Sequence, residues 1–260
     1  MQRSRYKRDR VSNTKSKKNI YILLTIIIFV SLILIFIWKV YSVDKFIYLN
    51  HAPNGDAEII LIDIKNNRTN KYLVSGEVEL DAAKGYGRYK IKNLWTLSTK
   101  DESRGGLVSD SFVINYSLPI YLWKDGSKSN LSIIQKIKAK FVENNRNIFI
   151  DKIDESLIPK SVYINFIDQY LSDNLNKIDV QDLTDDNVTI EKVSNILEVL
   201  GGKITTNSNG YNSDMDCEIS GSDKRIILTV NKIFRCKIVD HSDKSVDMTI
   251  KLGVKFAERF

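Results

Sequence analysis

The residues best suited to chemistry are a basic group in the middle of the chain, close to two glycine-containing stretches. Guanidinium and ammonium groups bind phosphate oxygens through charge-assisted hydrogen bonds, so such a group could contact a phosphate or a glycan. The competing interpretation is a solvated charged face, on which Asp101 and Glu102 balance the positive charge. The group consists of Arg88, Lys90, Lys92 and Arg104.

Acidic residues offer a second kind of chemistry. Asp56 stands just before an apolar stretch and could be a metal ligand or a phosphate or glycan contact, although an aspartate at such a place is more often a turn residue. Glu77 and Glu79 would share one face of an extended segment, but no third metal ligand accompanies them. We therefore predict no metal site. The two histidines, His51 and His241, lie in polar stretches, and we expect both on the surface.

The segment that precedes these residues determines on which side of a membrane they lie. The nineteen residues from Ile20 to Trp38 contain no charge, Gly or Pro, and a helix of that length matches the hydrocarbon core of a bilayer. A cleaved signal peptide would have a shorter apolar run and a small-residue cleavage site. We therefore expect a basic cytoplasmic tail over 1–18 and a single transmembrane helix over 19–41. Positively charged flanks stay inside, so the remaining chain is predicted to be extracytoplasmic.

The formal net charge of +7 does not indicate a nucleic-acid partner. Residues 1–18 contain eight Lys and Arg and one acid, so the rest of the chain contains 31 basic and 31 acidic residues. A basic footprint over a whole domain is missing, and we expect no binding to DNA or RNA. The tail can instead contact anionic lipid headgroups.

The chain contains only two cysteines, Cys217 and Cys236, and both follow the predicted anchor. Disulfides form and persist in extracytoplasmic compartments, which favours a bond between them. Two buried free thiols are the alternative, because a sequence does not give the separation of the two Cα atoms.

Hydrophobic periodicity predicts a mixed α/β extracytoplasmic region, built as a two-layer or three-layer sandwich. A stalk over 42–55 is expected to lead to one α/β domain over 56–176 and to another over 177–260. In the second domain the predicted order is β-α-β-α-β-β. There Asp185–Asn187 cap a helix, Gly201-Gly202 end it, and 246–252 alternate as a half-exposed strand.

Further elements are predicted in the middle of the chain. Apolar runs indicate strands over 58–64, 71–74 and 120–123, and helical spacing indicates helices over 107–116, 132–141 and 159–170. The Gly105-Gly106 pair is expected to break the chain before the first of these helices.

Residues 178–258 resemble the LytR C-terminal domain, which follows LytR-CpsA-Psr modules in cell-envelope proteins. The similar stretches are Val180–Thr184, Val193–Ile204, Ser222–Phe234 and Val246–Gly253. The cysteine pair brackets the third of these stretches. The resemblance implies a small α/β domain outside the membrane. One departure is Asp185–Asn187, which stands where the family has a glycine-rich turn.

The middle region resembles the catalytic LytR-CpsA-Psr domain in Asp56–Ile64, Tyr89–Trp95, Gly105-Gly106 and Leu118–Tyr121. Such enzymes transfer glycopolymers from a polyprenyl diphosphate carrier to peptidoglycan, and they need arginines, acids and a divalent metal. Here Ser75–Glu79 replace a P-R-D-T-like motif, and residues 127–176 contain only one arginine, Arg146. The resemblance therefore implies a degenerate domain without transferase activity and without a cofactor.

These features favour a single-pass protein of the bacterial cell membrane that binds a cell-wall glycan, a lipid-linked precursor or another envelope protein. Two alternatives stay open: a glycopolymer transferase that uses Mg²⁺ and relocated ligands, and a bitopic scaffold of the division type. Aromatic residues could stack on sugar rings, although core packing explains most of them. They are Tyr86, Tyr89, Trp95, Tyr116, Tyr121 and Trp123.

Overall fold

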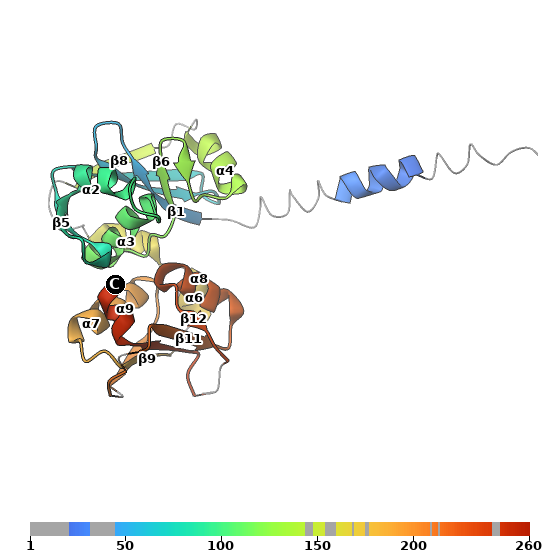
Figure 1. Ribbon diagram of the computed structural model, residues 1–260. Coiled ribbons are helices and arrows are strands. Elements are labelled where there is room, and N and C mark those ends of the chain that lie inside the picture. The colour runs from blue at the N-terminus through green and yellow to red at the C-terminus, as the bar shows by residue number, and fades with distance from the viewer. Residues whose placement is uncertain are drawn as a thin grey trace, which may run out of the picture. The chain divides into compact units, whose positions relative to one another are not determined.

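The computed structural model describes residues 21–31 and then 45–260, apart from 144–147, 154–159, 168, 175–176, 209, 213 and 241–244. The chain divides into two units, one ending at Asp44 and the other spanning Lys45–Phe260. The second unit contains two large sheets and their helices, so the predicted mixed α/β class is confirmed (Figure 1).

In the first unit, residues 21–31 are helical. The large apolar side chains of this helix are between 48% and 69% exposed. Among the described residues, no helix is both long and apolar enough to cross a membrane. The remainder of the predicted 19–41 helix, like the tail over 1–18, lies outside the described residues, so the anchor stays a prediction.

The first large sheet has the strand order β7-β6-β1-β2-β3-β8. Strands β1, β2 and β3 are antiparallel neighbours, whereas β6 runs parallel to β1 and β8 runs parallel to β3. The predicted strands over 58–64 and 71–74 are confirmed as β2 and β3. The bounds are β1 (Lys45–His51), β2 (Ala57–Asp63), β3 (Arg68–Val74), β6 (Trp123–Asp125), β7 (Lys128–Ser129) and β8 (Ile148–Ile153).

The prediction of a stalk over 42–55 is wrong for the residues from Lys45 onward. These residues form β1, an interior strand between β6 and β2, and Tyr48 and Leu49 are fully buried. The turn signal at Pro53 belongs to a hairpin rather than to a linker. The Ala52 N–H donates to the Asp56 carbonyl at 3.0 Å and closes that hairpin.

A small hairpin and two helices follow the antiparallel strands β1, β2 and β3. Helix α3 is buried over nearly its whole length, and the predicted helix over 107–116 is thereby confirmed. The Gly105-Gly106 pair does not break the chain but begins this helix. A Cβ on Gly105 would lie 2.4 Å from Cε3 of Trp123, so only glycine fits there. The elements are β4 (Glu79–Ala82), η1 (Ala83–Gly85), β5 (Gly87–Lys90), α2 (Ile91–Ser98) and α3 (Gly105–Tyr116).

One helix lies between β7 and β8 of the first sheet, and shorter helical pieces lie between β8 and the second sheet. The predicted helix over 132–141 is confirmed, whereas the one over 159–170 is divided into short pieces. Residues 120–122 are not in a strand, and β6 begins only at Trp123. The helices are α4 (Ile133–Glu143), α5 (Lys160–Tyr163), η2 (Ile164–Phe166) and α6 (Gln169–Asn174).

The second large sheet has the order β10-β9-β13-β11-β12, and its helices lie on one side of it, which makes two layers (Figure 1). Asp186 and Asp223 cap α7 and α8 by accepting backbone N–H bonds. The predicted order omitted β11 and the last helix. The bounds are β9 (Ile178–Asp182), α7 (Asn187–Val199), β10 (Ile204–Ser208), β11 (Cys217–Gly221), α8 (Lys224–Phe234), β12 (Lys237–Ile238), β13 (Met248–Leu252) and α9 (Val254–Arg259).

Strand β13 shows the alternation that the sequence predicts, with one difference. Met248, Ile250 and Leu252 contribute to the hydrophobic core under the helices. The intervening Thr249 is only 6% exposed instead of facing solvent. The reason is that β13 lies between β9 and β11, so neighbouring strands shield its polar face.

Cys217 and Cys236 form a disulfide, with their Cα atoms 4.8 Å apart, as the sequence favoured. The bond joins β11 to the segment just after α8. Arg259 of α9 packs on this junction, because its Nη2 donates to the Phe234 carbonyl at 2.9 Å and lies 3.3 Å from the Cys217 Sγ. The end of the chain is thereby attached to the disulfide.

We expect replacement of both cysteines by serine to lower the free energy of unfolding of the 45–260 unit. The loop that the disulfide closes spans 19 positions, and the chain-entropy estimate for such a loop is about 3 kcal/mol. Urea unfolding of the oxidised protein and of the Cys217→Ser/Cys236→Ser variant measures the difference. Ready alkylation of both thiols in the native protein, without a reductant, would contradict the disulfide.

Candidate binding site

The predicted basic face lies on the β4–β5 hairpin and the start of α2, and carboxylates on the same hairpin face it. Lys90 donates to Glu77 at 2.8 Å, and Lys92 also donates to Glu77. Arg88 Nε lies 3.6 Å from Glu79 Oε2. Hydrogen bonds from Lys90 and then Lys92 lower the pKa of Glu77 to about 2. A phosphate would have to displace these acids, so the arrangement is that of an exposed ionic surface.

Arg104 and Asp56 take no part in the ion pairs of this surface. Asp56 connects two turns, because its Oδ1 accepts from the Gly76 N–H at 2.7 Å and its Oδ2 from the Asn54 amide at 2.6 Å. Arg104 is exposed and precedes α3 with a φ of 50°. Within the described ranges, no three His, Cys, Asp or Glu side chains gather in a way that could hold a metal ion. Asp56 therefore has the geometry of a turn residue.

Asp101 organises the loop between α2 and α3, a role that the sequence did not indicate. It accepts two hydrogen bonds from Lys84 Nζ, at 2.8 and 3.0 Å, and one from the Tyr86 hydroxyl at 3.0 Å. Burial alone would raise the pKa of Asp101, but the bonds from Lys84 and Ser103 hold it well below its usual range. The Asp101 carboxylate is thus neutralised by Lys84, and the network holds the loop that leads into α3.

His51 is in a strand and not in a polar loop, contrary to the sequence prediction. Its ring stacks on Trp95, with centroids 4.6 Å apart, and its Nδ1 lies 2.8 Å from Asp125 Oδ1. These contacts connect β1 with α2 and with the end of β6. His241 lies outside the described residues. Trp95 and Tyr116 are buried, which agrees with core packing as the main role of the aromatic residues.

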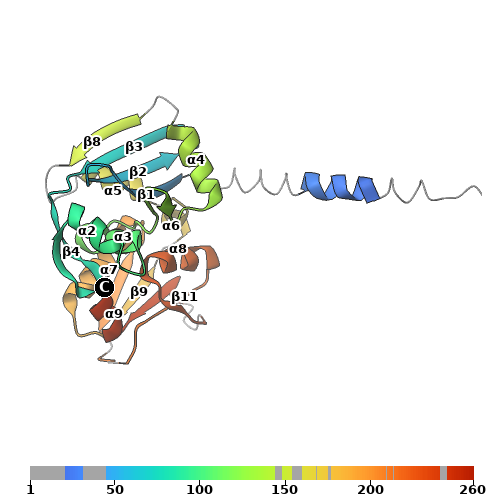
Figure 2. The same cartoon turned by 45° about the horizontal axis from the view of Figure 1, so that its top comes forward.

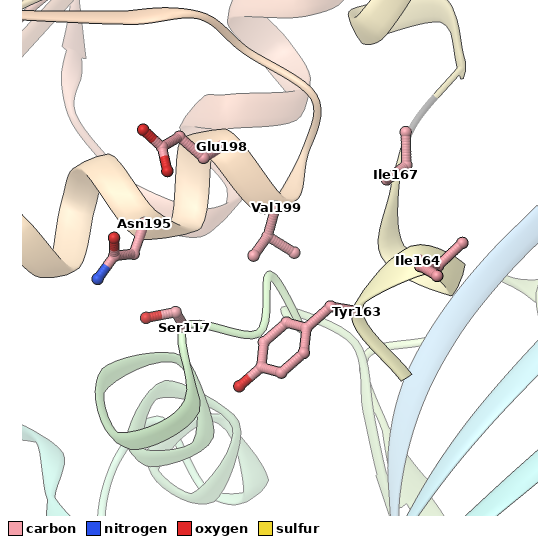
Figure 3. Close-up of a pocket in the computed structure, with 7 residues that line it drawn as sticks. All are labelled: Ser117, Tyr163, Ile164, Ile167, Asn195, Glu198 and Val199. Carbon is pink, nitrogen blue, oxygen red and sulfur yellow. The ribbon is translucent and has the colours of Figure 1, made fainter. Parts of the chain in front are cut away.

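A cavity of about 450 Å³ lies where α7 faces the end of α3 and the turn at η2. In Figure 3 the Tyr163 ring points toward Ser117, and Ile164 and Ile167 come from the same segment as Tyr163, across the cavity from Val199 of α7. The lining residues are Ser117, Tyr163, Ile164, Ile167, Asn195, Glu198 and Val199. The sequence analysis selected none of them as a site residue.

The lining of this cavity suits an uncharged polar ligand. The Tyr163 hydroxyl donates to the Tyr116 carbonyl at 2.8 Å, and burial raises the pKa of Tyr163, so the phenol stays neutral. Asn195 and Glu198 supply an exposed amide and an exposed carboxylate. Ile164 is 68% exposed and offers an apolar surface. Neither lysine nor arginine is among the described lining residues, so a diphosphate would find no cation there.

The helical pattern of the sequence contained a partial signal for this cavity. Val162 and Phe166 are four residues apart and are buried on one side of the α5–η2 segment. Ile164 and Ile167 do not share that spacing, and both are exposed. A pattern of apolar residues on two sides of a short helix can therefore indicate a binding surface.

A second, much smaller cavity lies at the ion pair between Asp110 and Arg235, whose Nη2 is 2.9 Å from Asp110 Oδ1. Its volume of about 20 Å³ has room for about one water molecule. Arg259 also lines it. This junction connects α3 with α8 and has the size of a structural contact.

We expect Asp110 to make the stability of the 45–260 unit depend on pH. Burial raises the pKa of Asp110, although Arg235 opposes this shift, so folding disfavours the charged carboxylate. The stability that it contributes is complete below about pH 4 and is lost as the pH rises through the raised pKa. Urea unfolding at several pH values should therefore show the wild type losing stability relative to Asp110→Asn as the pH rises. A difference that stays constant with pH would contradict the assignment.

Comparison with protein families and with curated proteins returns no family model that matches the chain and no curated protein with a significant similarity.

Proposed function

We propose that this chain is a membrane-anchored protein of the bacterial cell envelope, with its 45–260 unit outside, and that it binds an uncharged part of a cell-wall glycan. The anchor is the segment Ile20–Trp38. The supporting observation is the helix over 21–31, whose large apolar side chains are all exposed. Thr25 and Ser31 donate their hydroxyls to carbonyls one turn back, at 2.9 and 2.8 Å. A lipid-exposed helix needs this internal satisfaction of its polar groups.

The extracytoplasmic side follows from the charge of the tail and agrees with the cysteine chemistry. Eight basic residues precede the apolar segment, and such residues stay in the cytoplasm. The Cys217–Cys236 disulfide is of a kind that is rare in the reducing cytosol and common outside it. Both arguments lead to the same orientation.

The cavity beside α7 is the observation that carries the choice of ligand. Sugars present hydroxyls at their edges and apolar C–H faces, and proteins recognise them with amides, carboxylates, hydroxyls and aromatic or aliphatic surfaces. The cavity contains each of these groups, whereas Arg88, Lys90 and Lys92 of the predicted basic face are paired with Glu79 and Glu77. This contrast favours a neutral glycan over a diphosphate.

We expect purified glycan strands of peptidoglycan to bind the full-length protein, and substitutions in the cavity to weaken this binding. Asn195→Ala and Glu198→Gln should each raise the dissociation constant about fivefold, the contribution of about one hydrogen bond. Glu191→Gln is the matched control, because Glu191 is an exposed residue of α7 that does not line the cavity. Isothermal titration calorimetry gives the constants.

The same preparation tests the transferase alternative. We expect no saturable binding of polyprenyl diphosphate in the presence of Mg²⁺. The proposed ligand would be wrong if polyprenyl diphosphate bound saturably and only with Mg²⁺, and if all three variants bound glycan as tightly as the wild type.

The orientation is tested separately on cells. Protease added to intact cells with a permeable wall should cut the 45–260 unit, because that unit faces outward. A unit that is protected in intact cells but is cut after lysis would contradict the proposed topology, whatever the ligand is.

A further inference from the structure

Helix α4 exposes isoleucines and buries a lysine, the reverse of an ordinary surface helix. Ile133 is 73% exposed and Ile137 is 42% exposed, whereas Lys138 is only 7% exposed. With Lys136 and Lys140, the two isoleucines have the spacing i, i+3, i+4 and i+7, so the four side chains form one continuous face. We call these four residues the α4 face.

The charges of the α4 face are all positive. Lys136 and Lys140 are exposed beside the isoleucines, and none of Ile133–Lys140 is acidic. Lysine stems can lie along an apolar surface while the ammonium groups reach phosphates at its edge. A short helix with exposed apolar residues and flanking lysines is typical of a segment that lies in the interface of an anionic membrane.

The place of α4 in the fold fits such a contact. Helix α4 ends at Glu143, and β8 begins at Ile148, which pairs with Thr69 at the start of β3. Arg68 pairs with Asp63, and Asp63 pairs with Lys45, the first residue of β1. The end of α4 therefore leads to the same end of the sheet at which β1 begins. Figures 1 and 2 both show α4 beside that end.

With the proposed anchor in a bilayer, the covalent link to β1 would limit how far this end of the sheet could move from the membrane. Strand β1 begins only a few residues after the predicted 19–41 segment, and the linking residues 42–44 can span at most about 14 Å. An apolar and basic surface at the tethered end of the sheet would then be within reach of the headgroups.

We propose that the α4 face inserts into the outer surface of an anionic membrane and holds the 45–260 unit against the bilayer. The proposal rests on the membrane anchoring proposed above, and it adds a second attachment. A unit attached at two points has a restricted orientation, so it presents a defined side to the cell wall.

The test uses the full-length protein in lipid vesicles, with a single introduced cysteine that carries an environment-sensitive fluorophore. The two native cysteines are bonded to each other and do not react. Ile137→Cys reports on the α4 face, and Val188→Cys is the control, because Val188 is an exposed apolar residue of another helix, α7. With anionic vesicles, the fluorescence emission of the label at position 137 should shift to shorter wavelength, and brominated lipids should quench it. The label at position 188 should show neither change.

Charge reversal gives a second measurement. Lys136→Glu and Lys140→Glu should each reduce the ratio of inserted to free label by at least about fivefold, because each removes one basic residue and adds a carboxylate that the anionic surface repels. Circular dichroism confirms that these exposed substitutions leave the fold intact.

The outcomes separate the two proposals. If the chain resists carbonate extraction but the labels at positions 137 and 188 behave alike, the α4 face does not bind lipid and the anchor still stands. If carbonate extracts the chain, the proposed anchoring fails and the second attachment fails with it. A blue shift at position 137 without lipid quenching, accompanied by cross-linking between copies, would show instead that a second copy covers the α4 face.

Discussion

The burial of α3 on all sides is the constraint on which the rest of the 45–260 unit depends. Most of the large apolar residues of α3 join the core of the first sheet, while Val113 belongs to the core of the second. A helix with so little solvated surface can carry few polar groups, and two of its serines are satisfied by backbone carbonyls. Ser109 donates to the Ile120 carbonyl at 2.6 Å, and Ser111 donates to the Leu107 carbonyl at 2.8 Å. The bond from Ser109 attaches α3 to the segment that follows it.

Both cavities follow from this placement of α3. Its end at Ser117 adopts a left-handed conformation, with a φ of 53°, and contributes to the wall of the larger cavity. Its middle presents Asp110 to Arg235, and this ion pair lines the smaller cavity. The candidate site is therefore a consequence of how the two sheets share one helix, and its residues come from segments that are far apart in the sequence.

This origin explains what the sequence could and could not predict. Local signals sufficed for the caps of α7 and α8, because Asp186 and Asp223 act within their own turns. The strand β1 was not predicted, because its sequence next to a turn signal resembles a linker. The cavity was not predicted, because Ser117, Tyr163 and Glu198 are brought together only by tertiary packing. The acidic partners of Lys90 and Arg88 were not predicted either, because they depend on the register of the β4–β5 hairpin.

The pairing of basic and acidic side chains distinguishes a diphosphate ligand from an uncharged one better than any single residue does. A diphosphate-binding site usually contains lysine or arginine side chains that have no acidic partner. Their mutual repulsion is unfavourable until the diphosphate binds. In this chain the basic side chains of the hairpin contact Glu77 and Glu79, and Arg235 and Arg259 contact Asp110 and Asp216. The larger cavity has a neutral phenol, an amide and a carboxylate instead. Charge placed in this way favours selection by hydrogen bonding and shape, which is how an uncharged polymer is recognised.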